Sequence, residues 1–165
     1  MNRKNRLSRR HFWQMCASQL VTASLFTLAF PTTPVSAGVD QFQICAAELL
    51  RAGISRENAA RTCAEALYPK DLSLCVLKIE ELTPVAADEA LFACMRVRRP
   101  KELASCMVNI NQRTQGSDPL LVLANCRSTI RPLRFSECVI GLSREIDFSL
   151  PSALATCIDA EDFPR

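Results

Sequence analysis

The chain has 165 residues, of which 48% are hydrophobic and 22% are charged, and its formal net charge is +3. This composition is too apolar for a disordered chain and too often interrupted by charges for a protein with several membrane spans. Residues 1–37 hold five Lys and Arg and no acid, so residues 38–165 carry a net charge of −2, which argues against a general nucleic-acid binder.

The first 37 residues have the order of a signal peptide. A basic stretch precedes a mostly apolar one, and Val35-Ser36-Ala37 offers a small-x-small site for signal peptidase. We expect cleavage between Ala37 and Gly38, which divides the chain into a signal peptide (1–37) and one domain (38–165). The alternative is a membrane anchor that stays attached, but the cleanly apolar part, 20–30, is short for a span of roughly 20 residues.

The segment Ser8-Arg9-Arg10-His11-Phe12-Trp13 resembles the twin-arginine export signal. The resemblance implies export to the periplasm or the extracellular space, or to the thylakoid lumen if the host has one. Export by the ordinary Sec route is the alternative. Residues 38–165 retain eight of the nine cysteines and no His. An even number of cysteines outside the cytoplasm predicts a disulfide framework.

The eight cysteines recur at regular intervals. Their successive separations are 18, 12, 19, 12, 20, 12 and 19 residues, which indicates a repeat of 31–32 residues. In chain order they are Cys45, Cys63, Cys75, Cys94, Cys106, Cys126, Cys138 and Cys157.

Apolar residues accompany the cysteines at helical spacing. Around the first cysteine of each repeat they stand three before, one after and four after, as with Phe42 before Cys45, and a proline stands six before in three repeats. The second cysteine lies on a stripe of smaller residues. The residues eight before it, where a helix should begin, are Ser55, Ala86, Asp118 and Ser149, and all of them except Ala86 are good N-caps.

These stripes predict an all-α fold of four αα-hairpin repeats, stacked as an α-solenoid or as a compact helical array. No stretch shows the sustained alternation of a strand. The alternative is an irregular helical domain with coincidental cysteine spacing. The expected helices span 40–51, 55–67, 70–82, 86–98, 101–112, 119–130, 133–144 and 151–161.

Two disulfide pairings fit the spacing, and helix geometry permits both. One joins the two helices of each repeat; its bonds are Cys45–Cys63, Cys75–Cys94, Cys106–Cys126 and Cys138–Cys157. The other joins neighbouring repeats; its bonds are Cys63–Cys75, Cys94–Cys106 and Cys126–Cys138. The second pairing leaves Cys45 and Cys157 unpaired at opposite ends of a linear array, farther apart than the ~7 Å between Cα atoms that a disulfide allows. We therefore favour the first.

The residue inventory predicts a protein without catalytic residues or a cofactor. Residues 38–165 have no His for a catalytic centre or a metal, no C-x-x-C motif and no Gly-rich phosphate loop. The chemical alternative is a carrier or store of Cu(I) or Zn(II), held by reduced thiolates. In outline this alternative resembles the exported bundle-type copper storage proteins, which rely on a C-x-x-x-C pair on one helix, whereas each helix here has one cysteine.

Basic residues mark the expected turns between repeats, and stacking would align them as a ridge along one edge. One interpretation is that they cap the C-terminal ends of helices. The other is a strip that docks an acidic protein or an anionic surface ligand. The fourth turn breaks the pattern with Glu161 and Asp162. The residues of this basic ridge are Lys70, Arg98, Arg99, Lys101, Arg131 and Arg134.

One disulfide in each αα pair resembles the design of secreted cysteine-rich Sel1-type repeat proteins, whose glycine-rich consensus is absent here. Taken together, the sequence predicts an exported, non-catalytic helical-repeat protein that binds a partner protein or another ligand through an elongated face. A thiolate-based metal carrier is the second hypothesis.

Overall fold

A computed structural model describes residues 40–114 and 118–161, which all belong to one unit of the chain (Ser36–Arg165). The predicted signal peptide and its cleavage site lie outside these ranges. The described residues form helices and no strand, which confirms the all-α class. The helices are α1 (Gln41–Arg51), α2 (Arg56–Glu65), α3 (Pro69–Leu82), α4 (Ala87–Cys94), α5 (Pro100–Arg113), α6 (Pro119–Ser128), α7 (Pro132–Glu145) and α8 (Leu150–Asp159).

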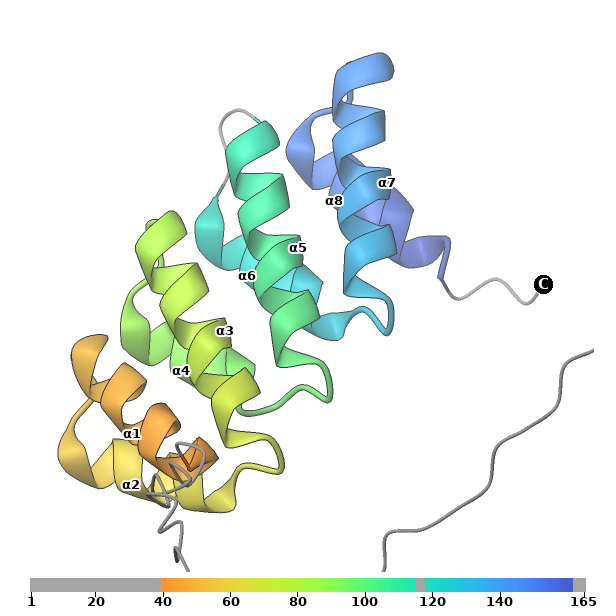
Figure 1. Cartoon of the computed structure of the whole chain (residues 1–165). Helices are drawn as coiled ribbons and strands as arrows, with labels where there is room; N and C mark the ends of the chain where they lie inside the picture. Colours follow the sequence, from red (N-terminus) through yellow and green to blue (C-terminus); the bar gives the residue numbers. More distant parts are fainter. Residues whose placement is uncertain (1–39, 115–117, 162–165) are drawn as a thin grey trace, which may run out of the picture. The chain divides into compact units, whose positions relative to one another are not determined.

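The helices pair in chain order as four hairpins. Odd-numbered helices pack against one another in sequence, and even-numbered helices pack mainly on their own hairpin partners. Figure 1 shows the hairpins side by side, with the odd-numbered helices in one layer and the even-numbered ones in a second. Among the described residues, helices contact each other only within a repeat or between neighbouring repeats. The four predicted αα repeats are therefore confirmed, and they stack as a solenoid.

Proline fixes where one hairpin ends and the next begins. Pro69, Pro100 and Pro132 are the first residues of α3, α5 and α7, and the residue before each has φ near −130° and ψ of 70–82°. A proline disfavours the helical conformation in the residue before it. The even-numbered helices stop sooner than we expected from the stripes: α2, α4 and α6 end at residues 65, 94 and 128, not at 67, 98 and 130. The backbone is already extended at Ala66 and Thr129, which follow α2 and α6.

The expected N-caps begin the even-numbered helices. The side chains of Ser55, Asp118 and Ser149 accept hydrogen bonds from backbone N–H groups in the first turns of α2, α6 and α8. Ala86 cannot accept such a bond, and the helix that it precedes, α4, is the shortest at 8 residues. Capping by Ser and Asp satisfies N–H groups that the helix itself leaves unpaired.

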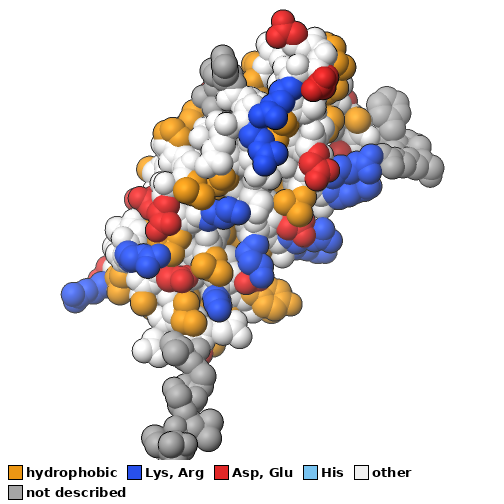
Figure 2. Space-filling model, turned by 45° about the horizontal axis from the view of Figure 1, so that its top comes forward, with side chains coloured by type: hydrophobic (Ala, Val, Ile, Leu, Met, Phe, Trp, Pro, Cys, Tyr) orange, Lys and Arg blue, Asp and Glu red, His pale blue; other side chains and the backbone are white. Residues whose placement is uncertain are grey.

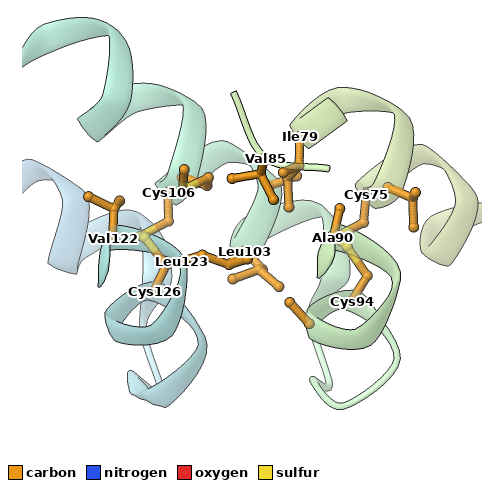
Figure 3. Close-up of a cluster of buried hydrophobic side chains, with 14 of the residues drawn as sticks. Cys75, Ile79, Val85, Ala90, Cys94, Leu103, Cys106, Val122, Leu123 and Cys126 are labelled. Carbon is orange, nitrogen blue, oxygen red and sulfur yellow. A yellow bond between two sulfur atoms is a disulfide. The ribbon is translucent and has the colours of Figure 1, made fainter. Parts of the chain in front are cut away.

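The disulfides join the two helices of each hairpin, which confirms the favoured pairing. They are Cys45–Cys63, Cys75–Cys94, Cys106–Cys126 and Cys138–Cys157, with Cα–Cα distances of 5.9–6.1 Å. Seven of these cysteines are buried, and Cys138 is half-buried. Figure 3 shows the two central disulfides with Leu103 between them, so sulfur and aliphatic side chains share one core.

The apolar stripe of the odd-numbered helices is buried as predicted in the two central repeats, whereas the terminal repeats leave Ala46 and Leu142 partly buried and Phe42 exposed. In α3 and α5 the residues three before, one after and four after the cysteine are at most 3% exposed. Phe42, at the corresponding place in α1, is 49% exposed. We expected Phe42 in the core; it is exposed because α1 packs on α2 and α3, and no described helix covers its other side.

Removing a central disulfide should destabilise the protein more than removing the last one. Cys75→Ala with Cys94→Ala, and Cys138→Ala with Cys157→Ala, each open a bridge of sequence separation 19. Both pairs should therefore lose about 3 kcal/mol of unfolding free energy through the entropy of the unfolded chain. The central pair should lose more, since Cys75 and Cys94 are buried between two neighbouring hairpins. Urea unfolding measures both losses, and equal losses would contradict this shared core.

Candidate functional site

Three turns lie at the same end of the hairpins, between α2 and α3, between α4 and α5, and between α6 and α7 (Figure 1). They carry the predicted basic ridge. Arg98 and Arg99 lie in the α4–α5 turn, and Arg131 lies in the α6–α7 turn. The other three ridge residues, Lys70, Lys101 and Arg134, lie in the first turns of α3, α5 and α7. All six are exposed.

Two members of the basic ridge are engaged in ion pairs. Nζ of Lys101 lies 3.0 Å from Oδ1 of Asp71, and Nη1 of Arg99 lies 3.4 Å from Oε2 of Glu102. Exposed pairs of this kind contribute little to stability. The other four ridge residues have no ion pair with any described residue, which leaves their charge for an external anion.

A cleft of about 330 Å³ lies between the α4–α5 and α6–α7 turns. We call it the arginine groove. Four arginines and no Asp or Glu are among its lining residues. Two of the four, Arg98 and Arg99, belong to the predicted ridge; Arg96 precedes them in the same basic run, and Arg127 was not predicted. The lining residues are Arg96, Val97, Arg98, Arg99, Cys126, Arg127, Ser128, Thr129, Ile130 and Pro132.

Arg96 and Arg127 share an aromatic ring. Cζ of Arg96 lies 4.1 Å from the centroid of the Phe92 ring, and Cζ of Arg127 lies 5.5 Å from it. Cation–π attraction acts within about 6 Å. Phe92 stands on α4 and Arg127 on α6, so the ring holds two guanidinium groups from adjacent repeats at one place. The cations at this end of the hairpins therefore include Arg127, in the last turn of α6, in addition to the arginines of the turns.

The preceding cleft differs in chemistry. It lies between the α2–α3 and α4–α5 turns, has a volume of about 580 Å³ and shares Val97 and Arg98 with the arginine groove. Its lining includes Tyr68 and Met95, together with one acid, Glu65. This first cleft is therefore mixed in charge and more apolar in character, while the arginine groove is basic.

At the α6–α7 turn, the corresponding place is taken by a carboxylate of the chain itself. Glu161, just after α8, accepts a hydrogen bond of 2.5 Å from Oγ1 of Thr129 and one of 3.4 Å from the backbone N–H of Ile130. The N–H of Arg131 in turn donates to Oγ1 of Thr129 over 3.1 Å. Glu161 therefore bridges the last two repeats. The neighbouring Asp162, which we also expected at this end, lies outside the described residues.

Other parts of the surface are mixed. On the face that Figure 2 presents, basic, acidic and hydrophobic side chains are intermingled.

Within residues 40–114 and 118–161 no group of three or more His, Cys, Asp or Glu is placed to hold a metal ion. No described helix is long and apolar enough to cross a membrane. The chain matches no protein-family model, no curated protein and no solved structure.

Replacing Glu161 should loosen the last repeat. Glu161→Ala removes a charged acceptor from the largely buried Thr129, which should lower the unfolding free energy by about 1–2 kcal/mol. Thr129→Val should cost a similar amount, and the double variant should lose little more than either alone because both changes break one contact. Glu145→Ala, an exposed acid at the end of α7, is the control. Urea unfolding that shows fully additive losses would exclude this contact.

Proposed function

We propose that the protein is an exported, non-catalytic scaffold that binds a partner protein through the basic ridge and the clefts beside it. Four disulfides indicate an oxidising environment. Together with the twin-arginine-like segment at 8–13, they support the periplasm or the extracellular space as its location. The residue inventory supports a non-enzymatic role, because residues 38–165 lack the His of the common catalytic centres.

The arrangement of charge carries this proposal. Turns about 31 residues apart in the chain bring cations to one end of the stacked hairpins, where four of the six ridge residues lack an ion pair with any described residue. Stacked repeats create extended binding surfaces of this kind. Unpaired cations along such an edge attract an acidic partner and orient it during encounter.

A thiolate carrier of Cu(I) or Zn(II) is the competing hypothesis. Its ligands would be the same eight cysteines that the structure pairs in four disulfides. The two hypotheses therefore require opposite redox states of the same sulfur atoms, because a metal binds the thiolate and not the disulfide.

Intact mass separates these two hypotheses. The protein recovered from the envelope fraction without reductant should have the mass of residues 38–165 less about 8 Da, because each of the four disulfides removes two hydrogen atoms. Thiol titration of the same sample should find no free sulfhydryl. A fully reduced mass with bound copper would replace the scaffold hypothesis with the carrier.

Reversing charge on the ridge should weaken partner capture. Arg98→Glu with Arg131→Glu changes two exposed arginines that have no ion pair among the described residues, so the melting temperature should stay the same. Capture of the partner from an envelope extract should fall at least tenfold. The control, Arg56→Glu with Arg144→Glu, makes the same charge change at the opposite ends of the hairpins. Equal capture by both variants would show that the basic ridge does not bind the partner.

A further inference from the structure

We propose that the arginine groove binds an acidic side chain from an extended segment of the partner protein, in the place that Glu161 takes at the next turn. This inference rests on the proposed scaffold function and deepens it, because it names the chemistry that the partner presents.

The α4–α5 and α6–α7 turns end with the same backbone conformation. Arg99 has φ −131° and ψ 70°, Arg131 has φ −132° and ψ 71°, and each precedes the proline that begins an odd-numbered helix. Beside the α6–α7 turn, the Glu161 carboxylate accepts from the N–H of Ile130 and from the hydroxyl of Thr129. The chain therefore contains one example of an acid bound against this type of turn. At the α4–α5 turn the counterpart of Thr129 is Val97, so arginine side chains have to supply the second donor there.

The chain supplies no such acid to the α4–α5 turn. Glu161 stands four residues after Cys157, and the residue four after Cys126 is Ile130. Ile130 lines the arginine groove and is 69% exposed. An apolar side chain cannot accept a hydrogen bond or neutralise a cation, so the acidic partner that the last repeat carries within the chain is missing from this groove.

The groove has the charge that an acid requires. Its four arginines have a single ion pair with a described residue, between Arg99 and Glu102. Like charges gathered at one cleft repel each other, and a bound carboxylate relieves that repulsion. The planar guanidinium group matches a carboxylate with two parallel hydrogen bonds. Phe92 already positions two of these groups, those of Arg96 and Arg127.

Size and lining favour a peptide over a polyanion. A volume of about 330 Å³ is near the lower end for small-molecule sites, and it suits one or two side chains. Val97 and Ile130 line the groove and the Phe92 ring holds two of its arginines, so apolar surface lies close to the cations. A peptide that pairs an acidic with an apolar residue would use both features, whereas a phosphate polymer would use only the charge.

The test uses a fluorescein-labelled peptide of sequence Gly-Glu-Leu-Glu-Gly with an amidated C-terminus, and the exported, oxidised protein. Fluorescence anisotropy should show binding that weakens with added salt, and the peptide with Gln in place of both Glu should bind at least tenfold more weakly. Arg96→Gln with Arg127→Gln should also weaken binding at least tenfold. The charge-matched control, Arg56→Gln with Arg144→Gln, should bind as the unchanged protein does.

Three results would overturn the inference. The first is equal binding of the Glu and Gln peptides. The second is equal binding by the groove variant and the control variant, with melting temperatures confirming that both are folded. The third is displacement of the peptide by inorganic phosphate as readily as by free glutamate at the same ionic strength, which would make the groove a general anion site.

The inference and the proposed function fail separately. If Arg98→Glu with Arg131→Glu abolishes partner capture while the groove variant binds the peptide normally, the ridge docks the partner and the groove does not take its acid. If the groove variant loses the peptide while the ridge variant captures its partner normally, the groove binds an acidic peptide and the proposed docking along the ridge is wrong.

Discussion

The disulfide inside each hairpin is the interaction on which the other features depend. The even-numbered helices have 8–10 residues, which is too short for a helix to be stable alone in water. They also make few contacts with one another, so the odd-numbered layer carries the packing between repeats. A bridge from the middle of each odd-numbered helix to the C-terminal end of its even-numbered partner holds the short helix against the long one. It also places sulfur beside aliphatic side chains in the common core.

Because the disulfide in each hairpin holds the two helices together, the side chains of the turns can differ from repeat to repeat. The even-to-odd spacing of cysteines is 12 residues throughout, and a proline starts each of α3, α5 and α7, so the residue before each proline has similar backbone angles in all three turns. Side chains on this common frame then differ. The first cleft is lined by Tyr68 and Met95, the second by four arginines, and the third place is filled by Glu161. One supporting structure thus presents three chemically distinct surfaces.

Three features of the protein differ from what the sequence pattern predicts. We expected longer even-numbered helices, because hydrophobic periodicity reports the buried face of a helix but not the residue at which the backbone becomes extended, such as Ala66 and Thr129. Phe42 follows the stripe, yet it is exposed, since periodicity identifies a face of a helix and not whether a neighbour covers that face. The basic ridge was predicted as a row of turn residues, and Arg127 was missed because it lies within α6.

The sequence alone determined the helices, the fourfold repeat and the pairing of the cysteines, because local periodicity and the reach of a disulfide leave few solutions. The tertiary structure decided which side chains meet across repeats. Arg127 reaches the ring of Phe92 on the neighbouring even-numbered helix, and Glu161 reaches a hydroxyl 32 residues away. These contacts depend on how far one hairpin is rotated and shifted against the next. Large buried side chains such as Leu103 and Met107 set that offset by their packing, and no local pattern records it.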